Sequence, residues 1–228
     1  MIGYPWRVYN VDIVMCIDAS GSMAPIIDEV KDIALSFYQK IVDTMEERGK
    51  DIEQLRIKVI AFRDYGCDEK PMEESKFFLL PEEDEEFKNF VNSIEAKGGG
   101  DGPENALEAI ALALKSDWTT GGFRQRHVVL VFSDAPALTL GERSGAAAYP
   151  GGLPNDLATL SAWWEGTDQS LGSTFKPKAG RLVAFVPNAY PWTDIQSWNR
   201  YWPAYSAAGS GLKDVDIQSA IDLVVGSC

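Results

Sequence analysis

The chain has 228 residues, of which 45% are hydrophobic, and its 21 basic and 34 acidic side chains give a formal net charge of −13. This composition is typical of a folded globular protein and excludes a disordered chain. The negative charge disfavours nucleic acid and anionic membranes as partners, and it suits cations or basic partners. Because no linker, repeat or low-complexity tract interrupts the chain, we expect a single domain over residues 1–228.

The cysteine and histidine content argues against several kinds of site. Cys16, Cys67 and Cys228 show no CxxC spacing, so neither a disulfide framework nor a zinc site is expected. The N-terminal MIGYPWRVYN lacks the features of a signal peptide, and no apolar run is long enough to span a membrane. We therefore expect a cytoplasmic protein with reduced thiols. The single histidine, His127, begins the strand-like run HVVLVF, and we interpret it as a structural residue.

Hydrophobic periodicity predicts strands and helices in alternation through the first half of the chain. Residues 11–17 form a short, β-branched, apolar run that is typical of a buried strand. A helix is expected from Pro25 to about Gly49, because apolar residues recur there at helical spacing. Residues 55–63 and 77–80 are strand-like, the second as an edge strand. The stretches EEDEEFKNFVNSI and ALEAIALALK each predict a helix.

The second half continues the alternation. HVVLVF, at 127–132, has the most buried appearance of any predicted strand, and RLVAFV, at 181–186, is another. Residues 153–164 are expected to form a helix between them, and DVDIQSAIDLVV predicts a final amphipathic helix that packs on the core. Strands that alternate with helices in this way predict a parallel or mostly parallel sheet with helices on both faces.

Side chains with oxygen atoms follow the predicted strands or open a helix at three places. They are Asp18, Ser20 and Ser22 after the first strand, Asp101 and Glu104 in KGGGDGPE, and Ser133 and Asp134 after HVVLVF. Ligand sites in such folds lie at the carboxyl ends of the strands, and hard divalent cations prefer oxygen ligands. A helix cap or a turn explains each stretch equally well when it is taken alone. Their conjunction predicts a divalent metal site.

The stretch DASGSM resembles the D-x-S-x-S signature of von Willebrand factor A domains, and the resemblance extends in element order over nearly the whole chain. It implies an α/β fold, Rossmann-like and doubly wound, with a mostly parallel six-stranded sheet and helices on both faces. It also implies a metal-ion-dependent adhesion site for Mg²⁺, with Mn²⁺ or Ca²⁺ as alternatives. By the same resemblance, Ser20 and Ser22 would bind the ion directly, and Asp18 and Asp134 would bind it mostly through water.

Two stretches depart from the commonest pattern of that family. Many members supply a threonine hydroxyl from the second loop, which this chain lacks. GGDGPE instead resembles the second loop in the A-like domains of integrin β-subunits, which implies Glu104 as a ligand, with Asp101 in support of it or at a second ion. FSDAPAL resembles the D-A-P variant of intracellular bacterial and protist members, some of them linked to kinase-type or stress-response modules.

Two further segments are expected beside the predicted site. Residues 138–152 are rich in Gly and Ala and lack a regular pattern, which fits either a functional loop or a poorly ordered insertion. The segment from Tyr190 to Tyr205 is rich in aromatic residues. We interpret most of them as packing residues and Trp192 as the best candidate for an interface.

The leading functional hypothesis is a metal-dependent protein-interaction domain without catalysis, monomeric by itself, whose protein partner supplies a carboxylate ligand to the ion. Helix N-termini that face the site would favour such a carboxylate. The alternative is a Mg²⁺-dependent phosphoryl-transfer or phosphatase-type enzyme. Two missing motifs argue against such an enzyme. The first strand does not end in D-x-D, and the chain has no P-loop. A serine hydrolase using Ser20 or Ser22 would lack the G-x-S-x-G elbow.

Overall fold

A mostly parallel β-sheet forms the centre of the computed structural model, which describes residues 8–100, 102–206 and 217–226. The sheet has seven strands in the order β3-β2-β1-β5-β6-β7, and β4 also pairs with β2. β2, β1, β5, β6 and β7 run parallel, whereas the short β3 and β4 run antiparallel to β2. The predicted α/β fold is therefore confirmed, with seven strands in the described residues rather than six.

The expected alternation of strands and helices holds only in part, because three strands follow one another after the first α-helix, two α-helices follow them, and the last two strands have no helix between them. The strands are β1 (Val8–Asp18), β2 (Asp51–Phe62), β3 (Met72–Glu74), β4 (Phe78–Leu80), β5 (Arg124–Phe132), β6 (Gly180–Pro187) and β7 (Tyr201–Ser206). The α-helices are α1 (Ile27–Glu47), α2 (Asp84–Ser93), α3 (Ala106–Leu114), α4 (Leu157–Glu165) and α5 (Ile217–Gly226). Short 3₁₀ helices occur at η2 (Gly21–Met23), η3 (Gln169–Leu171) and η4 (Pro177–Ala179).

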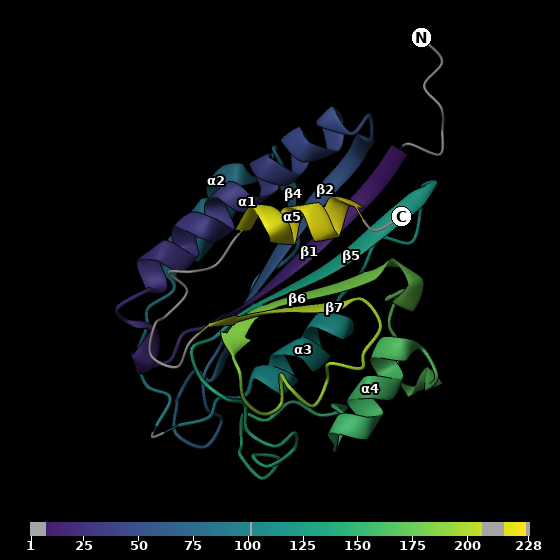
Figure 1. Cartoon of the computed structure of the whole chain (residues 1–228). Helices are drawn as coiled ribbons and strands as arrows, with labels where there is room; N and C mark the ends of the chain where they lie inside the picture. Colours follow the sequence, from purple (N-terminus) through teal and green to yellow (C-terminus); the bar gives the residue numbers. More distant parts are fainter. Residues whose placement is uncertain (1–7, 101, 207–216, 227–228) are drawn as a thin grey trace.

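Helices cover both faces of the sheet. α1, α2 and α5 lie on one face, and α3 and α4 lie on the other (Figure 1). A hydrophobic core lies on each face of the sheet, and the central strand β1 contributes to both. Ile13 and Met15 pack in the core under α1, whereas Val14 and Cys16 pack in the core under α3. A strand buried on both faces needs apolar residues at successive positions, which explains the continuous apolar run in β1. None of the helices in the described ranges is long and apolar enough to cross a membrane.

The aromatic segment before α5 contains a strand that the sequence pattern does not reveal. Tyr201–Ser206 form β7, which pairs with β6 in parallel at the edge of the sheet. Pro203 lies inside this strand, a position that proline tolerates mainly at sheet edges. Trp192 is 0% exposed, so its interpretation as an interface residue is wrong. Trp198 is also buried, and its ring stacks on that of Trp164.

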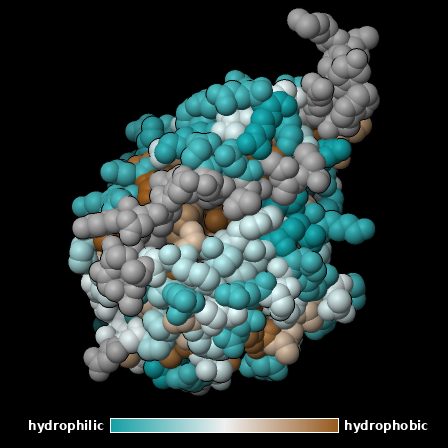
Figure 2. Space-filling model, viewed as in Figure 1, coloured by the Kyte–Doolittle hydropathy of each residue, from teal (hydrophilic) through white to brown (hydrophobic). Residues whose placement is uncertain are grey.

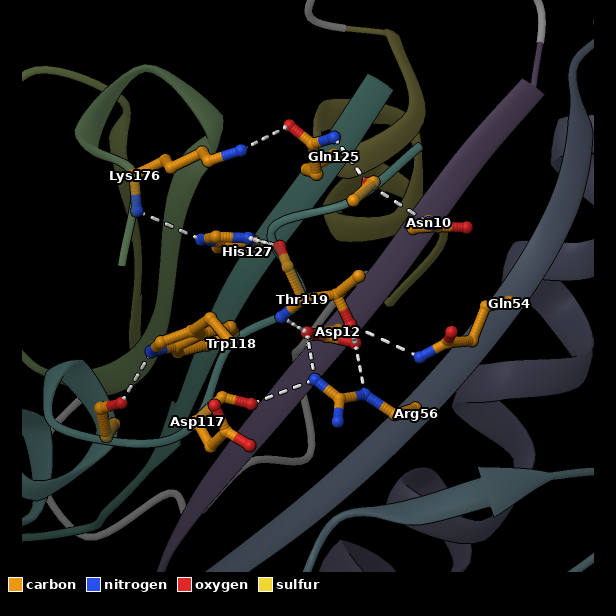
Figure 3. Close-up of polar contacts among 12 residues, drawn as sticks. Asn10, Asp12, Gln54, Arg56, Asp117, Trp118, Thr119, Gln125, His127 and Lys176 are labelled. Atoms are coloured by element: carbon orange, nitrogen blue, oxygen red, sulfur yellow. Dashed lines mark hydrogen bonds and ion pairs between the residues drawn. The ribbon is translucent and has the colours of Figure 1, made fainter. Parts of the chain in front are cut away.

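A polar network joins the strands near the amino ends of β1 and β5 (Figure 3). Asp12 on β1 is 0% exposed, and it accepts two hydrogen bonds from the Arg56 guanidinium on β2, at 2.9 and 2.7 Å. The Thr119 amide also donates to Asp12, at 2.6 Å. The Thr119 carbonyl lies 3.0 Å from Nε2 of His127, whose Nδ1 accepts from the Lys176 amide at 3.1 Å. This network ties the connection before β5 to the two central strands.

Candidate metal centre

The carboxyl end of β1 places a buried carboxylate beneath the predicted site. Asp18 is the last residue of β1, and its side chain is inaccessible to solvent. One carboxylate oxygen accepts the Ser20 amide at 2.9 Å, and the other accepts the Ser133 hydroxyl at 2.6 Å. Burial raises the pKa of Asp18 to about 6, although hydrogen bonds from Ser133 and Ser20 oppose that rise. Asp18 is thus held in a fixed orientation by both neighbouring loops.

The two serines and Asp134 continue this arrangement toward the surface. The Ser20 and Ser22 hydroxyl oxygens lie 3.0 Å apart, and the Ser22 hydroxyl donates to Asp134 at 2.8 Å. Ser20 is buried, whereas Ser22 in η2 is exposed. β1 and β5 are parallel neighbours, so the residues that follow them meet at one edge of the sheet. The structure therefore brings Asp18, Ser20, Ser22 and Asp134 together in one hydrogen-bonded series.

Glu104 approaches the same place from the segment before α3. Its backbone forms an isolated bridge with Ala137, in which its carbonyl accepts the Leu138 amide at 2.9 Å. The side chain is 2% exposed, and within the described residues its Oε2 has no hydrogen-bond partner. Burial, followed by repulsion from neighbouring carboxylates that include Asp18 and Asp134, raises the pKa of Glu104 to about 9. A buried, unpartnered carboxylate among other carboxylates is an environment that a cation would stabilise.

The glycine run in KGGGDGPE allows the second loop to approach the first. Gly99 has a φ of 87°, and a Cβ atom there would lie 2.2 Å from Oε1 of Glu104 and 2.5 Å from Cβ of Ser20. Only glycine fits between these two side chains without displacing them. The Gly98 carbonyl also accepts the Gly21 amide at 2.9 Å. Asp101, the remaining predicted ligand, lies outside the described residues.

Four of the predicted residues line one cavity of about 420 Å³. Its lining includes Ser20, Ser22, Glu104 and Asp134, together with glycine and proline residues of the adjoining loops. Within the described ranges, no group of three or more His, Cys, Asp or Glu side chains is arranged to hold a metal ion by itself. An ion here would therefore depend on the serine hydroxyls as well as on the carboxylates. Such an all-oxygen donor set fits a hard divalent cation.

Arg63, directly after β2, organises the loops around the cavity, and the sequence pattern does not predict this role. It is 2% exposed, and its guanidinium donates to the carbonyl oxygens of Ala19, Lys97 and Glu95 at 2.9, 3.0 and 2.8 Å. These carbonyls belong to the first and second loops of the site. The only signal in the sequence is an arginine at the end of the strand-like run LRIKVIAFR, which equally fits a residue in solvent.

Residues 138–152 follow Ala135 and Pro136 of the cavity wall and are anchored by two acidic residues, Asp64 and Glu108. Arg143 forms a two-point ion pair with Asp64, with distances of 2.8 and 3.0 Å. Glu108 on α3 is buried and accepts the Gly141 amide at 3.0 Å and the Tyr149 hydroxyl at 3.1 Å. Of the two interpretations of this segment, these contacts support a positioned loop.

His127 cannot serve as a base for the serines. It lies in register with Asp12 on β1, far from the carboxyl ends of the strands. Both of its ring nitrogens already have backbone partners, and burial lowers the pKa of His127 to about 4. Trp118 stacks on its ring with the centroids 4.9 Å apart. The nucleophile and base of a serine hydrolase are therefore not brought together.

Comparisons with known proteins address the family and the fold of this chain. Residues 12–142 match a family described as the von Willebrand factor A domain. The alpha-protein kinase vwkA of Dictyostelium discoideum is 29% identical over 147 residues, which are 64% of this chain and 22% of that protein. The chain thus spans about a fifth of the length of this curated relative.

Two groups of solved structures share the fold at low sequence identity. A pilus adhesin, SpaC from Lactobacillus rhamnosus GG, has a TM-score of 0.58 and 10% identity, over 95% of this chain and 30% of that one. Proximal thread matrix protein 1 from the mussel byssus has a TM-score of 0.52 and 13% identity, over 95% of this chain and 47% of that one. At this level of identity, these structures show a shared fold. Because the family match covers more than half of its length, the chain belongs to the von Willebrand factor A domain family.

Proposed function

We propose that this domain binds a protein partner through a divalent cation, Mg²⁺ first among the candidates, held at the carboxyl ends of β1 and β5. The observation that carries the proposal is the Glu104 carboxylate. It is buried and has an oxygen without a hydrogen-bond partner in the described residues, in a cavity that it shares with the hydroxyls of Ser20 and Ser22. A cation would satisfy that oxygen and offset the mutual repulsion of the surrounding carboxylates.

Each residue has a distinct part in such a centre. Ser20, Ser22 and Glu104 line the cavity and would hold the ion with their oxygens. Asp18 lies beneath them and would act through the hydrogen bonds that fix Ser20 and Ser133. Bound Mg²⁺ would supply a positive charge that accepts a carboxylate from outside. Ser22 and Asp134 leave the mouth of the cavity polar, so a partner's Asp or Glu side chain is the expected last ligand.

Isothermal titration calorimetry with Mg²⁺ and with Mn²⁺ tests this proposal. We expect the wild type to bind one ion with measurable heat, and Ser20→Ala/Ser22→Ala to lose binding by about tenfold or more, because two direct ligands are removed. Ser36→Ala/Ser93→Ala is the matched control, since both hydroxyls donate to carbonyls within helices away from the cavity. The proposal fails if the wild type binds neither ion, or if both double variants bind as the wild type does.

A further inference from the structure

A groove of about 760 Å³ lies at the end of the sheet opposite to the metal centre. It is bordered by the start of β2, the carboxyl half of α1 and the residues that follow β4. Asn10 near the start of β1 and Gly122 before β5 complete its wall. The groove therefore gathers five segments at the amino ends of the parallel strands, far from Ser20 and Ser22.

The lining of this groove combines acidic and apolar side chains. Its acidic residues are Glu46, Asp51, Glu53 and Glu82, and no Lys or Arg lines it among the described residues. Its aliphatic residues are Val42, Ile52, Leu55, Leu79 and Leu80. Leu79 is 37% exposed, and Phe123, which follows Gly122, is 70% exposed. Large apolar side chains that are exposed to solvent beside a groove are typical of surfaces that bind another protein.

The groove also exposes an edge of the sheet. β4 covers the outer side of β2 at Leu55–Ile57, and β3 covers it at Ile60–Phe62. In the ranges that the structure describes, no strand pairs with the outer side of residues 51–54. Such an edge presents backbone donors and acceptors to which an extended segment can add as a further strand.

Asn10 contributes a second, independent sign of a missing ligand. It is 7% exposed and lines the groove, and its Nδ2 donates to the Gly121 carbonyl at 3.2 Å. Its Oδ1 is buried without a hydrogen-bond partner in the described residues. In Figure 3 no dashed line reaches this oxygen from the residues drawn. An acceptor of this kind is expected to pair with a donor that enters the groove.

We infer that this groove binds an extended, basic segment of a partner protein, which adds a strand beside residues 51–54. Lys or Arg side chains of the segment would pair with Asp51 and Glu53, while alternate apolar side chains would contact Ile52 and Leu79. A second copy of this chain is a poor occupant, because it would bring the same carboxylates together in a protein of net charge −13. This surface is separate from the metal centre and does not depend on the proposed function.

Fluorescence anisotropy with a labelled synthetic peptide tests the inference. The probe alternates lysine and valine over about six residues, the length of a typical strand. We expect the wild type to bind it equally well with Mg²⁺ and with EDTA. Asp51→Lys/Glu53→Lys should weaken binding by about tenfold or more, because two attractive charges become repulsive at exposed positions of β2. Methylation of alternate backbone nitrogens in the peptide should also weaken binding, because it removes the donors of the added strand.

Glu29→Lys/Asp32→Lys is the matched control, because it changes the net charge equally at exposed positions of α1. This control should bind the peptide within about twofold of the wild type at moderate salt. The inference is overturned if the wild type does not bind the peptide, if both double variants lose binding equally, or if EDTA abolishes binding. It is also overturned if sedimentation shows a dimer that Asp51→Lys/Glu53→Lys dissociates, because the occupant would then be a second copy.

Discussion

Glu104 has an unusual environment for a glutamate. It is buried, one of its oxygens has no hydrogen-bond partner in the described residues, and the nearby acidic groups are Asp18, Asp64, Asp68 and Asp134. Burial is the main reason that its pKa is raised from 4.5 to about 9. At neutral pH and without a cation, the side chain is therefore mostly protonated. Binding of a cation would require it to lose that proton.

We expect Glu104→Gln to stabilise the metal-free protein at alkaline pH. An acid whose pKa is raised on folding destabilises the folded state as pH rises above the unfolded pKa, because the unfolded chain ionises first. For Glu104 this loss should accumulate between the unfolded pKa of 4.5 and the folded pKa of about 9. In the presence of EDTA, the variant should melt above the wild type at pH 8 by differential scanning calorimetry, and the two should converge at pH 5.

Glu85→Gln is the control for this comparison, because Glu85 is exposed on α2. It should melt like the wild type at both pH values. If Glu104→Gln melts below the wild type at pH 8, the carboxylate is stabilised in the metal-free protein and our description of its environment is wrong. With Mg²⁺ present the order should reverse, because the wild type alone retains the carboxylate ligand.

The sequence predicts some residues of the centre better than others. Asp18, Ser20 and Ser22 are close in the chain, and Asp134 follows a neighbouring parallel strand, so the strand pattern alone brings them to one edge. The supporting role of Arg63 depends on carbonyl groups from three separate segments, which are Ala19, Lys70, and Glu95 with Lys97. Backbone carbonyls carry no signature in a sequence, so that role cannot be read from residue types.

A largely buried ion pair joins the neighbouring strands β1 and β2. Asp12 and Arg56 are direct neighbours in the register of the two strands, and Asp12 is wholly buried. The Arg56 guanidinium also donates to the Asp117 carbonyl at 2.9 Å and lies over the Phe77 ring at 4.4 Å. These contacts connect β2 with the segment between α3 and β5 (Figure 3). Removal of one partner would leave the other with an unpaired charge.

Asp12→Ala is expected to lower the free energy of unfolding by about 3 kcal/mol, because it leaves Arg56 unpaired and strips the Thr119 amide of its acceptor. Asp12→Leu/Arg56→Met should cost less than the single variant, since apolar residues of similar size replace both charges. Equilibrium unfolding in urea measures both values. A double variant that is less stable than Asp12→Ala would contradict this account of the pair.

The sequence pattern predicts some strands of the sheet more clearly than others. β1, β5 and β6 are almost wholly buried, so their apolar runs stand out. β7 forms the outer edge, is partly exposed and contains Pro203, so neither alternation nor an apolar run marks it. β3 has three residues, too few for any periodic pattern. Hydrophobic patterns thus predict the central strands of this sheet but not the short or partly exposed strands at its edges.

The whole molecule carries a net charge of −13, which favours general attraction of cations at its surface. Binding of a divalent ion at the candidate metal centre should be distinguishable from this general attraction. Hydrophilic residues lie over α1 in Figure 2, and acidic side chains at the surface are expected to bind ions weakly in addition. Monovalent and divalent salts at matched ionic strength separate the two effects, because screening depends on ionic strength whereas ligation depends on the ion.

We expect MgCl₂ to raise the melting temperature more than NaCl at the same ionic strength. An ion that binds only the folded state adds about 2.7 kcal/mol at a concentration one hundred times its Kd. Ser20→Ala/Ser22→Ala should respond equally to the two salts, while Ser36→Ala/Ser93→Ala should behave as the wild type. Thermal unfolding followed by circular dichroism provides the measurement. Equal responses to both salts in the wild type would mean that screening alone accounts for the effect.

The length of β1 fixes the distance between the two ends of this domain. Asn10 and Asp18 lie on the same strand, and at about 3.3 Å per residue they are separated by roughly 26 Å. A ligand at one end therefore leaves the other end sterically free. Two partners, one acidic and one basic, would be held at a set spacing and on opposite sides of the molecule. In that arrangement the central strand would set the spacing between them, and the domain would join proteins of opposite charge.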